Sequence, residues 1–269
     1  MKLGISTAAF YGRWETEEAA RVIESLPVDC AEVFLQSAGE YEKPFARMVK
    51  ENLGCIPCTS MHPSGILFEN QMFGRSARQR QEAYDLFERA LDAAQMLGAQ
   101  CYVYHGRNTA QLKPLPFHLQ ANIDMIGRMN ELASKRELAI AWENVFWCQL
   151  TTCERVIAVR EACPEARFTL DIKQAMRAGE DPCAMAQAMG DALLNVHVCD
   201  WDGQGKLCLP GEGVFDFDRF AGVLHDMGYD RPVIVEPYLA LIGSDETLHA
   251  SLEYMKQILD SADRDCFSD

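Results

Sequence analysis

The 269-residue chain lacks two features that would place it on a membrane or on nucleic acid. Its apolar runs are short and interrupted, and none is long enough to span a bilayer. Basic residues are scarce, because 25 lysines and arginines stand against 40 aspartates and glutamates, a formal net charge of −15. Nucleic acid or an anionic membrane as the main partner requires a basic footprint, so the composition argues against both.

A signal-peptide pattern and a regular cysteine framework are also missing. The first residues lead directly into an apolar stretch with no cleavage site. The eleven cysteines are odd in number and scattered, and Cys101 and Cys199 lie inside strand-like runs, as reduced, buried thiols do. The close pair Cys55 and Cys58 has no second ligand pair nearby for zinc, which favours structural cysteines over a metal or redox site. We therefore expect a cytoplasmic protein.

Eight short apolar stretches bounded by turn residues predict β-strands along the whole chain. They cover residues 2–7, 31–36, 57–62, 101–106, 138–144, 167–172, 193–200 and 232–237. Helical patterns lie between them, over 75–98, 117–134, 152–163, 216–228 and 246–260. In the first of these, Gly98 stands where a helix C-cap is expected.

The alternation of strands and helices predicts an α/β fold with parallel pairing. The length fits a closed (β/α)8 TIM barrel better than an open doubly wound sheet, and no GxGxxG motif follows the first strand. No linker or change of composition divides the chain. We predict a single barrel domain over residues 1–261, followed by a flexible tail over 262–269.

Polar residues close almost every predicted strand, which is where active residues of such barrels gather. They are Glu32, His62, His105, Glu143 with Asn144, Asp171 with Lys173, His197 with Asp200, and Glu236. The two-residue period of a strand places Asp171 and Lys173 on one face, and it places Glu143 on the face opposite Trp142. The polar set is therefore predicted to point into the barrel mouth.

Carboxylates that converge in a partly dry cavity repel one another unless a cation holds them. Taken singly, an aspartate or histidine at a strand end could be a helix cap or a satisfied core residue. Glu143, Asp171, His197 and Glu236 stand together on the last four strands, and we interpret them as ligands of one divalent metal ion. The mostly oxygen donor set favours Mn²⁺, Mg²⁺ or Co²⁺, and Zn²⁺ is also compatible.

Several motifs resemble the xylose isomerase-like TIM barrel superfamily, in particular its sugar phosphate isomerase/epimerase branch, which is related to AP endonuclease family 2. They are AWENV, TLDI, HVCDWDG followed by LPGEGVFDF, and VIVEPY, and the resemblance covers nearly the whole chain. It implies that Glu143, Asp171, His197 and Glu236 bind one metal. It also implies that the two glutamates form the acid–base pair, as in ketose 3-epimerases and hydroxypyruvate isomerase.

The chain departs from this family at two places. Relatives usually carry a histidine three residues beyond the strand-six aspartate, where this chain has Gln174. The abasic-site endonucleases, which use several zincs, need an Asp-x-His where this chain has Lys206 and Cys208. The trinuclear zinc site is therefore broken, although His62 and His105 match it. In single-metal relatives those two histidines often contact substrate.

These observations predict an isomerase of the ketose epimerase or aldose–ketose isomerase type. Its substrate is a small sugar, sugar phosphate or keto acid, and the proton moves through a metal-stabilised enediolate with two glutamates as acid and base. An inosose-dehydratase-like lyase on the same site is the alternative. An abasic-site endonuclease and a non-catalytic binding barrel are weaker alternatives. The sequence leaves open whether the protein is a homo-oligomer.

Candidate substrate-binding residues complete the predicted site. They are His62, His105, Lys173, Gln174, Trp14 and Glu212. Trp14 could stack on a sugar face or be an ordinary surface residue, and Lys173 could bind a substrate anion or form an ion pair with Asp171. The segment from Pro210 to Gly213 could form a backbone nest for an anion. Residues 62–68 could cover the barrel mouth.

Overall fold

The computed structural model describes residues 1–65, 68–108 and 116–264, and within them eight parallel strands close into a barrel. The strands are β1 (Lys2–Ser6), β2 (Cys30–Leu35), β3 (Cys58–Pro63), β4 (Cys101–Tyr104), β5 (Ala139–Glu143), β6 (Arg167–Asp171), β7 (Leu193–Val198) and β10 (Pro232–Val235). Each pairs with its neighbour in the chain, and β10 closes the barrel on β1. The predicted TIM barrel is confirmed.

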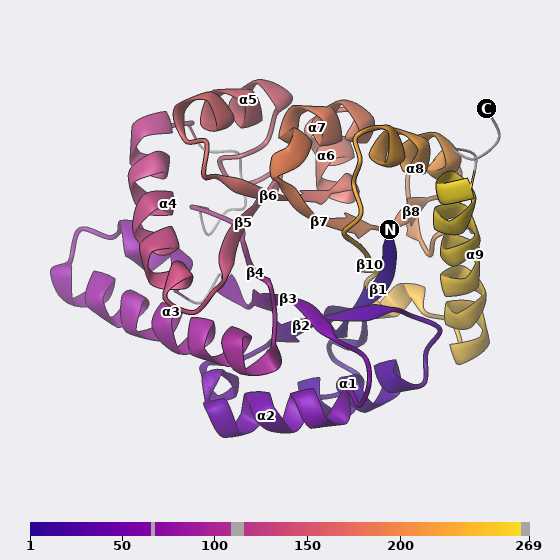
Figure 1. Ribbon diagram of the computed structural model, residues 1–269, viewed down its shortest axis with the longest axis horizontal. Helices are drawn as coiled ribbons and strands as arrows, with labels where there is room; N and C mark the ends of the chain where they lie inside the picture. Colours follow the sequence, from indigo (N-terminus) through magenta and orange to yellow (C-terminus); the bar gives the residue numbers. More distant parts are fainter. Residues whose placement is uncertain (66–67, 109–115, 265–269) are drawn as a thin grey trace.

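The helices surround the ring of strands, as Figure 1 shows. They are α1 (Thr16–Glu24), α2 (Lys43–Asn52), α3 (Ala77–Leu97), α4 (Leu119–Ser134), α5 (Cys153–Ala162), α6 (Ile172–Ala178), α7 (Pro182–Met189), α8 (Phe217–Asp226) and α9 (Asp245–Arg264). The five predicted helical patterns correspond to α3, α4, α5, α8 and α9. The sequence patterns did not single out α1, α2, α6 or α7, which are ten residues or shorter.

Helix α3 illustrates how the local sequence determines where a helix begins and ends and which face it buries. The Ser76 side chain caps its first turn by accepting from the Gln79 backbone N–H, and Gly98 ends it with a φ of +87°. Phe87, Leu91 and Leu97 are buried on one face of the helix. Burial of that apolar face fixes α3 against the outside of the barrel.

Strand β6 ends one residue earlier than predicted, at Asp171, and helix α6 begins at once. The Asp171 side chain caps this helix by accepting from the Gln174 backbone N–H at 2.9 Å. Lys173 does lie beside Asp171, as predicted, but strand alternation is not the reason. Lys173 lies in the first turn of a helix, and helical geometry brings it back over the end of the strand.

Two further predictions concern the ends and thiols of the chain. Helix α9 continues to Arg264, so residues 262–264 of the predicted tail are helical, and 265–269 lie outside the described residues. The ten described cysteines are free, with Cys58 buried at the start of β3 and Cys55 exposed. Among the described helices, none has the length and apolar character that crossing a membrane requires.

Candidate active site

A cavity of about 240 Å³ lies where the barrel strands end at their carboxyl side. It gathers most of the polar residues that were predicted to face the barrel mouth, together with an aromatic wall. Its lining consists of Ala8, Tyr11, Phe34, His62, His105, Glu143, Val145, Trp147, Asp171, Lys173, Gln174, Glu236, Pro237 and Tyr238. Side chains from seven of the barrel strands, or from the segments directly after them, thus meet in one hollow.

The four predicted metal ligands lie together at the base of this cavity. Donor atoms of Glu143, Asp171 and His197 are all within 4.8 Å of one another. The Nδ1 atom of His197 is 3.9 Å from Glu143 Oε1 and 3.6 Å from Glu236 Oε2. Glu143, Asp171 and His197 are almost fully buried, whereas Glu236 is partly exposed.

A buried carboxylate behind His197 fixes the orientation of its ring. Glu32 Oε2 lies 2.9 Å from His197 Nε2 and also accepts hydrogen bonds from Ser60 Oγ at 2.7 Å and Asn195 Nδ2 at 3.0 Å. Burial alone would raise the pKa of Glu32, but the charge and hydrogen bond of His197 outweigh it and lower this pKa to about 2. His197 Nδ1 has no hydrogen-bond partner among the described residues and lies toward the carboxylates of Glu143 and Glu236.

Asp171 is held from two sides. Asn144 forms a pair of hydrogen bonds with its backbone, donating from Nδ2 to the carbonyl at 3.0 Å and accepting from the N–H at 2.7 Å. The carboxylate oxygen Oδ1 caps helix α6. The other oxygen, Oδ2, accepts no hydrogen bond from the described part of the chain and lies 3.2 Å from the ammonium of Lys173. One oxygen of Asp171 is therefore structural and the other points to the site.

Lys173 is a buried cation between two of these carboxylates. Its ammonium donates to Glu236 Oε2 at 3.3 Å, lies 3.2 Å from Asp171 Oδ2 and stands 5.1 Å from the Tyr238 ring centre. The residue is 4% exposed. Burial works against its charge, but Asp171 and Glu236 outweigh burial and raise the pKa of Lys173 well above its usual value. The ammonium is therefore charged at any physiological pH.

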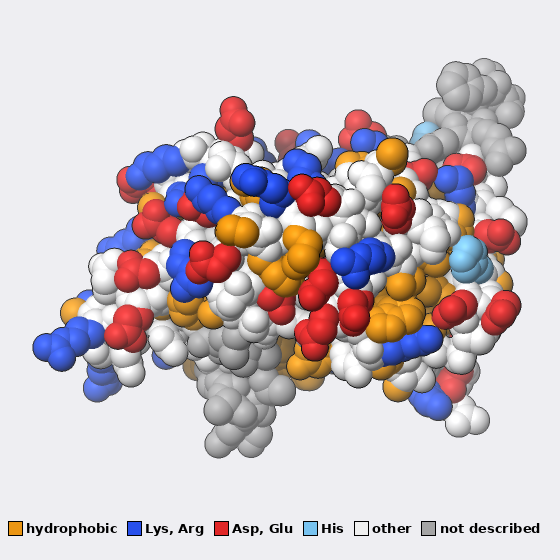
Figure 2. Space-filling model, turned by 90° about the horizontal axis from the view of Figure 1, so that it is seen from below, with side chains coloured by type: hydrophobic (Ala, Val, Ile, Leu, Met, Phe, Trp, Pro, Cys, Tyr) orange, Lys and Arg blue, Asp and Glu red, His pale blue; other side chains and the backbone are white. Residues whose placement is uncertain are grey.

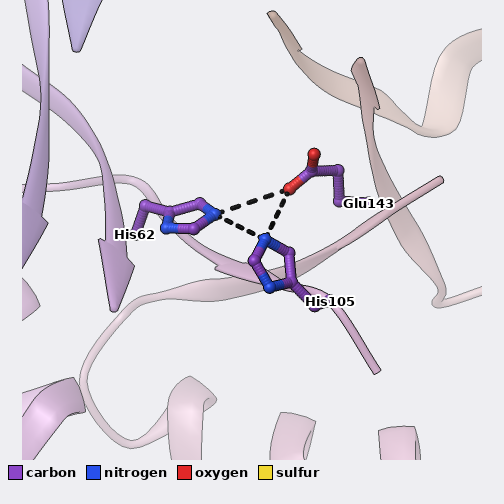
Figure 3. Close-up of side chains that lie close together, drawn as sticks. All are labelled: His62, His105 and Glu143. Atoms are coloured by element: carbon purple, nitrogen blue, oxygen red, sulfur yellow. Dashed lines mark hydrogen bonds and ion pairs between the residues drawn. The ribbon is translucent and has the colours of Figure 1, made fainter. Parts of the chain in front are cut away.

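A second cluster, shown in Figure 3, joins His62 and His105 to Glu143. The two Nε2 atoms are 2.8 Å apart, and Glu143 Oε2 lies 3.1 Å from that of His105 and 3.5 Å from that of His62. Burial would raise the pKa of Glu143, but the two histidines and His197 lower it well below the usual value. Glu143 is therefore an ionised carboxylate with one oxygen toward His197 and the other toward this histidine pair.

Glu69 is a buried carboxyl next to the site. No sequence pattern had singled out this residue. It begins the short helix η4 (Glu69–Phe73) and is 1% exposed. Tyr102 Oη donates to Glu69 Oε1 at 3.0 Å, while Oε2 has no hydrogen-bond partner among the described residues. Burial raises the pKa of Glu69 to about 7, although His105 acts to lower it. This group titrates near neutral pH.

Two predicted substrate contacts lie elsewhere. Trp14 packs its ring 5.3 Å from that of Phe10, with the Arg13 guanidinium 4.3 Å from its ring centre, and it is not among the described residues that line the cavity. Glu212 is exposed and accepts from the Leu209 backbone N–H at 3.3 Å. Each side chain contacts residues of its own loop, and neither is among the described residues that line this cavity.

Asp200 fills the predicted anion nest. Its carboxylate accepts four backbone N–H groups, from Trp201 at 2.7 Å and from Gly211, Gly213 and Phe215 at 3.0 Å each. A Cβ at Gly213 would lie 2.1 Å from a backbone oxygen and 2.3 Å from Asp200 Oδ1, so only glycine fits there. The loop over 209–217 therefore folds around a carboxylate of the chain itself.

Part of the cavity wall is aromatic and exposed. Tyr11, Phe34, Trp147 and Tyr238 line it, and Tyr11 and Tyr238 are exposed. Residues 62–68 were predicted to cover the barrel mouth, but residues 66 and 67 lie outside the described residues. Phe68 is buried against Tyr41, with ring centres 6.0 Å apart, and therefore belongs to the outer packing of the barrel.

Comparison with known proteins gives one family match and several similar folds. Residues 17–258 match the family described as xylose isomerase-like TIM barrel. An uncharacterized protein of Mycobacterium leprae is 24% identical over 290 residues, which cover 96% of this chain and 98% of that protein. The crystal structure of D-psicose 3-epimerase in the presence of D-fructose has a TM-score of 0.77 at 16% identity, covering 96% of this chain and 99% of that one. The 3-keto-D-glucoside 4-epimerase of E. coli has a TM-score of 0.73 at 17% identity, with the same coverage.

Proposed function

Because the chain belongs to the xylose isomerase-like TIM barrel family, we propose that it is a metal-dependent isomerase or epimerase of a small sugar or sugar-derived keto compound. The observation that carries this proposal is the convergence of Glu143, Asp171 and His197 within 4.8 Å, beside Glu236 and at the base of a cavity. The sugar epimerases of the same fold support a carbohydrate substrate.

The donor atoms of this site suit a divalent cation. His197 Nδ1 is buried without a hydrogen-bond partner among the described residues, and such an atom is costly unless something binds it. Asp171 Oδ2 also accepts no hydrogen bond from the described residues, and the ammonium of Lys173 lies 3.2 Å from it. Glu32 holds the far side of the His197 ring, an arrangement that orients histidine ligands in metal proteins. We propose that Glu143, Asp171, His197 and Glu236 are the ligands. The oxygen-rich set favours Mn²⁺, Mg²⁺ or Co²⁺.

We propose that the two glutamates transfer the proton from opposite sides of a bound substrate. A divalent cation would polarise the substrate carbonyl and its neighbouring hydroxyl. Glu143 ends β5 and Glu236 follows β10, with β6 and β7 between them in the barrel. Glu143 is held ionised by its histidine neighbours and can accept the proton next to the carbonyl. Glu236, partly exposed and hydrogen-bonded to Lys173, can return a proton from the other side.

We assign substrate contacts to the polar residues that remain in the cavity lining. His62 and His105 face the cavity beside Glu143, and Lys173 and Gln174 lie at its opposite edge. Gln174 stands where relatives carry a histidine, and its Oε1 accepts a long hydrogen bond from Phe146 N–H at 3.4 Å. Its amide N–H groups can therefore donate to a substrate hydroxyl.

The alternatives differ in what they require of the surface and the site. Cleavage of DNA would need a basic face, whereas Figure 2 shows acidic side chains interspersed with the basic ones on the face drawn. Cys208 lies in the short hairpin of β8 (Asp200–Trp201) and β9 (Leu207–Cys208), outside the groups of candidate ligands among the described residues. A dehydratase would use the same ligands and the same base, and only the fate of the substrate distinguishes it.

The test is incubation of the metal-loaded protein with a panel of ketoses and keto acids in deuterated water. Incorporation of deuterium at the carbon next to the carbonyl supports proton transfer, and the product distinguishes epimerase, isomerase and lyase. Bound metal without exchange on any member of the panel would contradict the proposed function. It would leave a binding barrel as the better description.

A further inference from the structure

Lys173 makes the proposed metal site unusual, because an ammonium already neutralises two of its four ligands. Its Nζ lies 3.2 Å from Asp171 Oδ2 and 3.3 Å from Glu236 Oε2, and the residue is 4% exposed. A cation bound through all four ligands would use the same two carboxylates, and for Asp171 the same oxygen, since Oδ1 caps helix α6. Two positive charges would then compete for one pair of carboxylates.

The candidate ligand atoms fall into two groups that share His197. Donor atoms of Glu143, Asp171 and His197 form one group within 4.8 Å, and Glu236 belongs to a different group, with Glu32 and His197. The hydrogen bond from Lys173 accounts for the position of Glu236 Oε2. Bringing Glu236 to the other three ligands requires breaking or loosening its bond to the ammonium.

We propose that Lys173 is an internal counter-cation, which a divalent ion must displace from Asp171 and Glu236 in order to bind. This inference rests on the proposed function, because it takes the four residues as a metal site. The ammonium stabilises the carboxylates when the ion is absent and weakens binding of the ion through charge repulsion. The affinity of the site is therefore lower than its four ligands alone would provide.

The experiment is a titration of chelator-treated protein with Mn²⁺, in which the free ion is measured by electron paramagnetic resonance. Lys173→Met removes the charge and keeps an unbranched apolar chain. We expect it to bind Mn²⁺ at least ~10-fold more tightly than the wild type, since the ion no longer competes with or faces a cation. The melting temperature of the chelator-treated variant should fall below that of the wild type, and saturating Mn²⁺ should restore it.

Two control variants separate this effect from a general loss of charge or of an ion pair. Lys256→Met also removes a lysine that pairs with an aspartate, at 3.0 Å from Asp29, but at the surface. It should leave the Mn²⁺ affinity unchanged. Lys173→Arg keeps the positive charge and should not bind Mn²⁺ more tightly than the wild type. If Lys173→Met does not fold, Lys173→Gln serves for the same titration, because its amide can still donate to Glu236.

The outcomes distinguish this inference from the proposed function. Equal or weaker Mn²⁺ binding by the variant, while the wild type binds, overturns the role of Lys173 and leaves the metal site intact. Binding by the variant alone supports the displacement and contradicts a metal-dependent function of the wild type. Absence of binding by either protein overturns both.

Discussion

Replacement of Glu69 by glutamine should make the protein more stable at alkaline pH and leave it nearly unchanged at acidic pH. Burial raises the pKa of this carboxyl from 4.5 to about 7 in the folded protein. Between these two values the unfolded chain has released the proton and the folded chain has kept it. The unfolded state therefore binds fewer protons, and the free energy of unfolding falls as the pH rises through this window.

The magnitude follows from the size of the pKa difference. At 1.36 kcal/mol per pKa unit, the full cost of ionising Glu69 in the folded state is about 3 kcal/mol, and about 2.5 kcal/mol of it develops between pH 5 and pH 8. Glutamine has nearly the same shape and its side-chain oxygen can still accept from Tyr102 Oη. It carries no titratable proton, so the variant loses this pH dependence.

The assay is urea unfolding of both proteins at pH 5 and pH 8, with a chelator present to keep the metal site constant. The quantity to compare is the free energy of unfolding of the variant minus that of the wild type. The contributions of the other titrating groups are the same in both proteins and cancel in this difference. Glu253→Gln, at an exposed position of α9, is the matched control and should show the same difference at both pH values. A difference for Glu69→Gln that does not change with pH would refute the reasoning.

Three further predictions concern the site itself. We expect the wild type to bind about one divalent ion per chain, and His197→Ala or Asp171→Ala should each remove it without unfolding the barrel. Full metal occupancy in both variants would refute the ligand assignment. Glu143→Gln and Glu236→Gln should each lower turnover at least ~100-fold, since glutamine cannot exchange a proton; near-normal kcat in either would show that the residue is not an acid or base. Glu32→Gln should weaken Mn²⁺ binding about 10- to 100-fold by releasing the His197 ring, and unchanged affinity would argue against its positioning role.

The barrel and the polar residues that end its strands were predictable because both depend on short-range patterns. Parallel strands are covered on both faces and appear as brief continuous apolar runs, and a polar residue that ends such a run stands out. Glu143, Asp171, His197 and Glu236 were found in this way, each from its own strand. The family resemblance then implied the role of each one.

The remaining features depend on contacts that no local pattern encodes. Glu32 meets His197 across a sequence separation of 165 residues, through the order of strands around the barrel. Lys173 was placed near Asp171 by strand alternation, although the chain turns into a helix there. In the loop after β1, Tyr11 rather than Trp14 lines the cavity, since the side-chain directions of an irregular segment follow no period.

The carboxylate of Asp200 holds the loop after β7 in its shape without a bound ligand. Four backbone N–H groups that could receive a phosphate are already satisfied from within the chain. Losing this one side chain would expose a ready-made set of donors while the glycines that shape it stay in place. An external anion could therefore use these donors only by displacing Asp200 from them.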